Sequence, residues 1–242
     1  MANWSDPRTI GAEPGIDVGA RGAAFDAGLR SYMLSVYNYM ASGVLLTGLV
    51  SYFFAKSGMA LAIAHGPVMW LVALSPLAFI LVMNFGLNKM STTTLQACFW
   101  AFATVMGLSM SVIFLRYTEA SIFQAFLATS ASFLGLSLFG YTTKKDLSGF
   151  GTFLIMGVVG LLVASIANIF LHSSTLSFAI SAIGVLVFAG LTAYDTQRIK
   201  SMYSYVAGTD MIGKTAIMGA LNLYLDFVNM FQFLLSFMGS RD

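Results

Sequence analysis

Seven long runs of apolar residues, separated by short polar segments, occupy the chain from Tyr32 to Met238. A helix needs roughly 20 apolar residues to cross a bilayer hydrocarbon core of about 30 Å, and each run has about that length. The pattern therefore predicts an all-α integral membrane protein with seven transmembrane helices. The expected helices are Tyr32–Ala55, Gly66–Leu87, Thr94–Leu115, Ser121–Tyr141, Gly149–Leu171, Leu176–Tyr194 with an extension to Ile199, and Ile212–Met238.

The composition agrees with this pattern and limits the function classes. The 242 residues are 58% hydrophobic and 9% charged, whereas soluble domains carry about 45–50% apolar and about 25% charged residues. The net charge of +2 is too small to indicate a nucleic-acid partner. The single cysteine, Cys98, excludes an intrachain disulfide and a metal site built from thiolates.

The N-terminal segment differs from the rest of the chain. Residues 1–30 mix charged residues with glycine and alanine, and they contain no apolar core of the length that a cleavable signal needs. We therefore expect a polar N-terminal tail, residues 1–24, followed by a seven-helix transmembrane domain, residues 25–242.

Lysine and arginine residues are distributed unevenly between the two sides of the predicted bundle. Nine lie on the side of the N-terminus and three on the other side. Because cytoplasmic loops carry the Lys/Arg excess in membrane proteins, we expect a cytoplasmic N-terminus and an external C-terminus. The nine are Arg8, Arg21, Arg30, Lys89, Lys144, Lys145, Arg198, Lys200 and Lys214, and the three are Lys56, Arg116 and Arg241.

The last apolar run contains a carboxylate near its middle, Asp226. Charged side chains at a bilayer centre cost roughly 2.5–3.5 kcal/mol on insertion scales. Asn222, Asp226 and Asn229 are spaced i, i+4, i+7, so they fall within about 60° of one another on a helix. Polar groups that face lipid stay unsatisfied, so this stripe should face other helices or a watered cavity. The two asparagines are open to a second interpretation, as hydrogen-bonding contacts between helices.

A second acid, Asp195, closes the sixth apolar run. Arg198 lies three residues further on, so one interpretation is a salt bridge at the membrane interface; Thr192 lies one turn earlier. The other interpretation is that Asp195 is the partner of Asp226, since the two helices are neighbours in the chain. No Lys or Arg lies near mid-membrane in any run. Two further candidates for polar contacts, Asn84 and Asn88, close the second run.

Two acids without a fixed cation favour a proton or cation site. Their oxygen ligands suit hard cations such as Ca²⁺, which would contact Asp195 and Asp226 transiently. Two acids that share one proton titrate as a coupled pair. When protonated, such a pair holds the last two helices together; when ionised, it repels and can bind a cation. We therefore expect a pH-sensing cation pathway that is closed at low pH, with no cofactor.

An enzyme of a different class also places two aspartates on its sixth and seventh helices. Tyr194-Asp195 resembles the Tyr-Asp motif of the intramembrane aspartyl proteases. Their second acid lies in a Gly-x-Gly-Asp motif, whereas Leu223-Tyr224-Leu225 precedes Asp226 here, and no Pro-Ala-Leu motif follows. No zinc-helix signature, Walker loop or Ser/His dyad is present either. We expect no enzymatic activity.

The same two acidic segments resemble the Bax inhibitor-1 family, also called the transmembrane Bax inhibitor motif family, in its bacterial members. The matching segments are Gly190-Leu-Thr-Ala-Tyr-Asp-Thr-Gln-Arg-Ile-Lys200 and Ala220-Leu-Asn-Leu-Tyr-Leu-Asp-Phe-Val-Asn-Met-Phe231. The resemblance covers roughly residues 25–238. It implies six helices around a central C-terminal seventh, in the bacterial inner membrane. It further implies a pH-sensitive Ca²⁺ leak gated by an aspartate pair, whose positions Asp195 and Asp226 match.

The resemblance leaves two points open. The family pattern includes a basic residue on the second helix that latches the acid of the sixth, and only Asn84 or Asn88 is available to stand in for it here. Bacterial relatives are also linked to a membrane-bound AAA protease. The alternative function is therefore a regulator that does not transport, interacts with such a protease through its polar tail, and modulates stress or cell-death responses.

Overall fold

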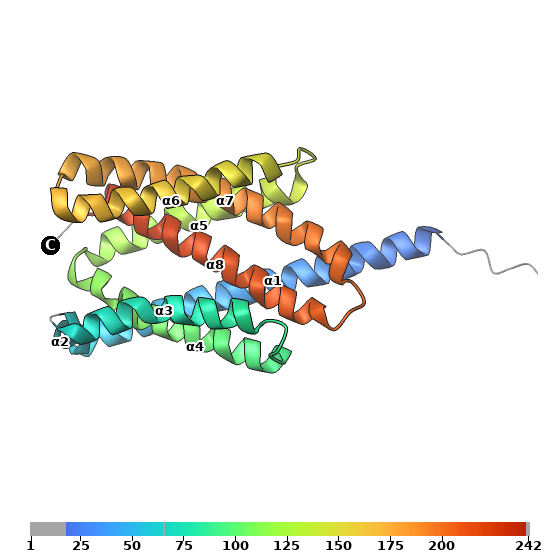
Figure 1. Ribbon diagram of the computed structural model, residues 1–242, viewed down its shortest axis with the longest axis horizontal. Helices are drawn as coiled ribbons and strands as arrows, with labels where there is room; N and C mark the ends of the chain where they lie inside the picture. Colours follow the sequence, from blue (N-terminus) through green and yellow to red (C-terminus); the bar gives the residue numbers. More distant parts are fainter. Residues whose placement is uncertain (1–17, 65, 241–242) are drawn as a thin grey trace, which may run out of the picture.

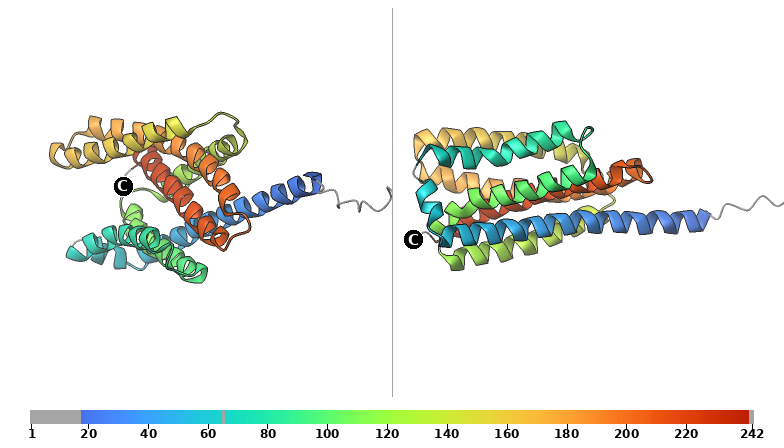
Figure 2. Two further views of the ribbon diagram at one scale, coloured as in Figure 1. Left: turned by 45° about the vertical axis from the view of Figure 1, so that its right-hand side comes forward. Right: turned by 90° about the horizontal axis from the view of Figure 1, so that it is seen from below.

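A computed structural model describes residues 18–64 and 66–240 of the chain, and this part is helical, without strands. Helix α8 lies between α6 and α7 on one side and α3 and α4 on the other (Figures 1 and 2). The elements are α1 (Val18–Lys56), α2 (Met59–Ala64), α3 (Pro67–Gly86), α4 (Thr92–Met110), the 3₁₀ helix η2 (Ser111–Leu115), α5 (Glu119–Thr142), α6 (Ser148–Leu171), α7 (Ser174–Val206) and α8 (Met211–Met238).

The last helix, α8, is the centre of the bundle. It packs against α1, α4, α5 and α7. Its apolar window is 61% buried, compared with 11–39% for the other helices long enough to span a bilayer. Side chains on the outer helices are mostly exposed and apolar, as expected where they meet lipid tails. The central place of the C-terminal helix agrees with the expectation from the sequence.

The number of helices differs from the expected seven. The described residues form eight α-helices because the segment between the first two apolar runs folds into a short helix, α2. Gly58, with a φ of +79°, separates α2 from α1, and six residues that favour helix, Met-Ala-Leu-Ala-Ile-Ala, follow. Six helices are long and apolar enough to cross a membrane. Helix α3 runs antiparallel to α4 along the bundle (Figure 1), but its role as a seventh span stays a prediction.

Two helices extend beyond their expected boundaries, and the extensions pack against each other. Helix α1 begins at Val18, inside the expected polar tail, and α7 continues to Val206. Phe25 of α1 lies 5.0 Å from the Tyr203 ring of α7, measured between ring centroids. The backbone of Gly28 approaches the Tyr203 hydroxyl so closely that a side chain at this position would have to displace the Tyr203 ring. This contact explains why helix persists where the apolar pattern fades. Residues 1–17 of the expected tail lie outside the described residues.

A buried chain of hydrogen bonds fixes the rotation of α8. The Tyr224 hydroxyl lies 2.6 Å from Oγ1 of Thr47 on α1. The Thr47 hydroxyl in turn donates to the carbonyl of Ala103 on α4, at 2.8 Å. Tyr224 is fully buried. Because residues two apart on a helix point about 200° apart, anchoring Tyr224 between α1 and α4 turns Asp226 toward α7.

Candidate functional site

The two acids lie on the same cavity, which has a volume of about 320 Å³. It lies between α6, α7 and α8, and it contains most of the polar residues that the sequence singled out. The lining residues are Ile155, Val158, Phe188, Leu191, Tyr194, Asp195, Arg198, Asn222, Leu225, Asp226 and Asn229. The polar stripe of α8 therefore faces a cavity, as its spacing predicted.

The carboxyl groups of Asp195 and Asp226 lie within hydrogen-bonding reach of each other. Because α7 continues for eleven residues beyond Asp195, this acid sits about 16 Å inside the helix, not at its end as expected. Asp226 is only 4% exposed. Its Oδ2 atom is buried and has no hydrogen-bond donor among the residues that the structure describes. Two ionised carboxylates can only accept, so this contact becomes a hydrogen bond only if a proton is held between them.

The alternative interpretation of Asp195, a salt bridge with Arg198, is not formed. Within residues 18–64 and 66–240, the structure contains one ion pair, Lys56–Glu119 at 2.7 Å. Arg198 is exposed and exerts an electrostatic attraction on Asp195 without reaching ion-pair distance. The acid pair therefore has a cation nearby but is not neutralised by it.

The neighbours of Asp195 on α7 hold the helix in place. Gln197 accepts from the backbone N–H of Leu147 at 2.9 Å and donates to the carbonyl of Lys145 at 2.8 Å. Lys200 donates to the carbonyl of Tyr141 at 2.7 Å, and its ammonium lies 4.7 Å from the centroid of the Tyr141 ring. The Gly190–Lys200 segment thus uses Gln197 and Lys200 to anchor α7 to the end of α5 and the following loop, which leaves Asp195 facing the cavity.

The loop held by Gln197 also has its own internal order. The backbone N–H of Ser148 donates to Asp146 at 2.9 Å. Hydrogen bonds from the Ser148 side chain and backbone lower the pKa of Asp146. This carboxylate is solvent-exposed and lies outside the cavity, so it takes no part in the acid pair.

The remaining predicted site residues separate into two groups. Asn222 and Asn229 line the cavity, and Asn229 also donates to the carbonyl of Leu225 at 2.8 Å. Thr192 is buried within α7 and donates to the carbonyl of Phe188. Asn84 is exposed and donates to the carbonyl of Ile80 on its own helix. Asn88 is exposed too, and neither Asn84 nor Asn88 lines the cavity, so the structure does not bring a latch from α3 to Asp195.

The cavity offers a metal ion few ligands. No group of three or more His, Cys, Asp or Glu side chains occurs among the described residues. The pair supplies four carboxylate oxygens, and Asn222 and Asn229 add amide oxygens. Ca²⁺ takes six to eight oxygen ligands, so a bound ion would keep water in its coordination shell and be held weakly.

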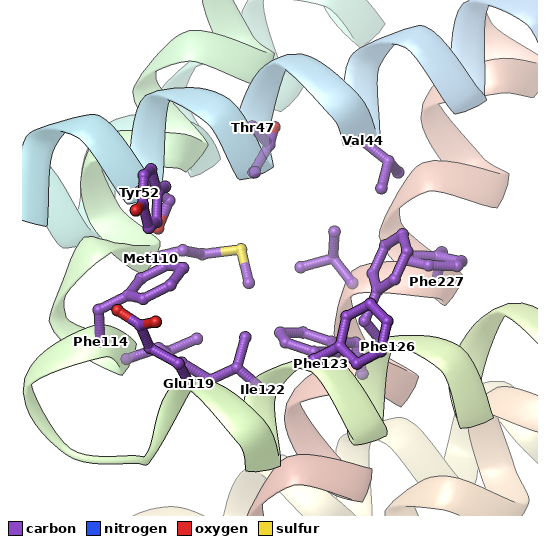
Figure 3. Close-up of a pocket in the computed structure, with 15 residues that line it drawn as sticks. Val44, Thr47, Tyr52, Met110, Phe114, Glu119, Ile122, Phe123, Phe126 and Phe227 are labelled. Atoms are coloured by element: carbon purple, nitrogen blue, oxygen red, sulfur yellow. The ribbon is translucent and has the colours of Figure 1, made fainter.

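Two other cavities of similar size lie nearer the C-terminal end of α8 than the acid pair does. One, of about 340 Å³, lies between α6, α7 and α8 and is lined by serine, asparagine and glutamine side chains together with Ile169, Ile180 and Phe233. The other, of about 310 Å³, lies between α1, α5 and α8 and is almost entirely apolar, with Glu119 at its edge (Figure 3). The sequence reasoning missed both. The signal for the first is present in the chain, because Ser177, Ser181 and Ser236 interrupt the apolar runs.

Comparison of the sequence with known proteins identifies the family of the chain. Residues 29–242 match the family described as "Inhibitor of apoptosis-promoting Bax1". The chain belongs to the Bax inhibitor-1 family. It is 42% identical over 219 residues to the inner membrane protein YbhL of Escherichia coli strain K12, covering 89% of this chain and 94% of that protein. It is 46% identical over 229 residues to a protein of Caulobacter vibrioides (89% and 91% covered). It is 44% identical over 232 residues to protein RP147 of Rickettsia prowazekii (92% and 94% covered).

Family membership and the helices agree on the location of the protein. An inner membrane relative that aligns with nearly the whole chain, and six helices long and apolar enough to span a bilayer, make this a multi-pass membrane protein. The resemblance drawn from the two acidic segments is confirmed. Both segments of this Bax inhibitor-1 family member line the same cavity.

Proposed function

We propose that this protein is a pH-sensitive cation leak of the inner membrane, with Ca²⁺ as its physiological cation and Asp195 and Asp226 as its proton and cation site. The observation that carries the proposal is the acid pair itself. Its two carboxyl groups lie within hydrogen-bonding reach of each other. Among the described residues, a buried oxygen of Asp226 lacks a donor and no ion pair neutralises either acid.

The direction of the pH response follows from this contact. With one proton between the carboxyl groups, the pair forms a hydrogen bond that joins α7 to α8. Without that proton the two carboxylates carry like charges and repel each other; as a general scale, two unit charges 4 Å apart interact by about 4 kcal/mol at an effective dielectric constant near 20. Either separation of α7 from α8 or binding of a cation relieves this repulsion. The leak is therefore closed at low pH and conducts as the pH rises.

The other groups around the pair do not provide a second switch. The remaining titratable or charged residues on the cavity are Tyr194 and Arg198, both from α7, and α6 contributes only the apolar Ile155 and Val158. Arg198 carries a guanidinium cation that attracts Asp195 without forming an ion pair with it. Its attraction for a carboxylate opposes protonation of Asp195 but does not reverse the direction of the response.

A weak site is what a leak requires. Conduction needs binding that is favourable enough for the ion to enter and weak enough for it to leave. Two carboxylates assisted by Asn222 and Asn229 satisfy that condition better than a closed cage of six to eight oxygens. The role is non-enzymatic and needs no cofactor. The alternative is a regulator that an AAA protease binds through the polar tail, and residues 1–17 of that tail lie outside the described residues.

Reconstitution tests the proposal. Purified protein in liposomes that contain a Ca²⁺ dye should show flux that rises with pH. Asp226→Asn and Asp195→Asn should each remove the pH-dependent part, because an amide can neither ionise nor share a titrating proton. Asp210→Asn, at the solvent-exposed start of α8, is the matched control and should behave like the wild type. Flux that is absent at every pH, or that is unchanged in Asp226→Asn, would exclude the proposal.

A further inference from the structure

The polar stripe of α8 continues outward beyond the acid pair, with one interruption. Asn222, Asp226 and Asn229 line the cavity of the acid pair, called the inner cavity below. Ser236 lines the serine-containing cavity of about 340 Å³, called the outer cavity. Their spacing of four, three and seven residues keeps them on one helical face. The position that completes this repeat between Asn229 and Ser236 is Phe233, the single apolar member of the stripe.

The facing stripe of α7 shows the same arrangement. Asp195 and Arg198 line the inner cavity, and Ser177 and Ser181 line the outer one. Between them, on the same face, lies Phe188, which lines the inner cavity and is 7% exposed. On the faces that α7 and α8 turn toward each other, polar residues thus lie at both ends and an aromatic residue lies between them.

The polar side chains of the outer cavity are neutral serine, asparagine and glutamine residues, and Ile169, Ile180 and Phe233 complete its lining. Ser181 on α7 donates to the hydroxyl of Ser236 on α8 at 3.0 Å. Asn168 on α6 donates to the hydroxyl of Ser177 at 2.6 Å and accepts from the backbone N–H of Ser173. These contacts join all three helices around a space of about 340 Å³. Its hydroxyl and amide oxygens can replace part of the hydration shell of a cation without binding it tightly.

A stacked aromatic pair separates the two cavities. The rings of Phe188 and Phe233 have centroids 5.7 Å apart and planes inclined by 27°. Phe233 lies directly against the backbone of α7 at Gly184, where a methyl group would come within 2.6 Å of the ring. The stack is seven residues from Asp226 along α8 and seven from Asp195 along α7, which is about 10 Å in each helix.

We infer that the outer serine-lined cavity is the external half of the cation path, and that Phe188 and Phe233, seated on Gly184, form the hydrophobic barrier between it and the acid pair. Hydrophobic constrictions of this kind gate by excluding water. Separation of α7 from α8 on deprotonation of the pair opens the stack, because each helix carries one ring. The inference rests on the proposed function and adds the residues that close the path.

Flux measurements test the barrier. Phe233→Ala should raise Ca²⁺ flux at low pH, where the wild type is closed, because the constriction then admits water. Phe233→Leu, which keeps the position apolar and large, should stay closed. The matched control is Phe237→Ala. Phe237 pairs with Phe178 across the same two helices, with ring centroids 4.9 Å apart, but lines neither cavity, so its truncation should leave flux unchanged. Equal flux in Phe233→Ala and Phe237→Ala would overturn the inference.

Cysteine accessibility tests the same barrier independently of transport. In a Cys98→Ala background, Ser181→Cys should react with a charged thiol reagent applied from one side of the membrane only, and Asn229→Cys only from the opposite side. Adding Phe233→Ala should make each position reactive from both sides. This pattern without Ca²⁺ flux would refute the cation leak but keep the barrier. Reactivity of Ser181→Cys and Asn229→Cys from the same side in the parent protein would refute the barrier even if flux is present.

Discussion

Gly140 is the position where the packing that aims Asp195 is tightest. Helix α5 crosses α7 there. A methyl group at Gly140 would overlap the carbonyl oxygen of Ala193 and lie 2.9 Å from its carbonyl carbon. Backbone cannot move aside as a flexible side chain can, so Gly140→Ala must push α5 away from α7. Ala193 is two residues before Asp195, so the acid should move as well.

The size of the effect follows from two opposing terms. Replacing glycine by alanine inside a helix stabilises it by up to about 1 kcal/mol, and overpacking a tight contact costs about 1–3 kcal/mol. Gly135 isolates the first term, because it lies on the same helix, is exposed, and has no atoms within 4 Å of a built methyl group. We expect Gly140→Ala to be about 1–3 kcal/mol less stable than Gly135→Ala.

Unfolding by SDS in mixed micelles, followed by circular dichroism, measures this difference. The same two variants in liposomes should also differ in the pH dependence of Ca²⁺ flux, with Gly135→Ala close to the wild type. If Gly140→Ala is as stable as Gly135→Ala, α5 and α7 do not approach as closely as described, and the account of how Asp195 is positioned fails.

Two other predictions follow from the anchoring of α7 and from the charge distribution. Gln197→Ala should lose about 1–3 kcal/mol of unfolding free energy, because each of its two hydrogen bonds to the α5–α6 loop contributes about 0.5–1.5 kcal/mol. Ser201→Ala, on the exposed side of α7, is the control, and equal loss in both variants would contradict the role of Gln197. The first residues of α1 and the end of α8 lie at opposite ends of the bundle (Figure 1). An alkaline phosphatase fused to the C-terminus should therefore be active outside the cell, while an N-terminal label stays protected. The reverse result would refute the orientation inferred from the Lys/Arg count.

The apolar runs predicted most helices because the length and apolar composition of a segment determine whether it can span a bilayer. The expected Gly149–Leu171 and Ile212–Met238 agree with α6 and α8 to within one residue. The apolar pattern did not predict helix ends that depend on tertiary contacts. Helices α1 and α7 extend past their apolar runs because Phe25 and Tyr203 pack against each other. Helix α2, with 6 residues, is far shorter than the roughly 20 residues of a transmembrane span, so a search for apolar runs of that length does not detect it.

The candidate site was predictable in part for a similar reason. The spacing of Asn222, Asp226 and Asn229 predicts that they form one stripe, since all three belong to the same helix. The partnership of Asp195 with Asp226, by contrast, depends on how α7 and α8 cross, so the sequence left a salt bridge to Arg198 open. The stack of Phe188 on Phe233 gives no signal in the sequence, because an aromatic residue in an apolar run is ordinary until its partner on another helix is known.

A pH jump on the wild-type protein tests the central claim most directly. Vesicles that hold the reconstituted protein and a Ca²⁺ dye, prepared at low pH with external Ca²⁺, should show almost no influx. Raising the pH should start influx within the same sample, and returning it to the original value should stop it, because the shared proton is restored to Asp195 and Asp226. Influx that does not change with pH, or that rises only as the medium becomes more acidic, would contradict the acid pair as the gate.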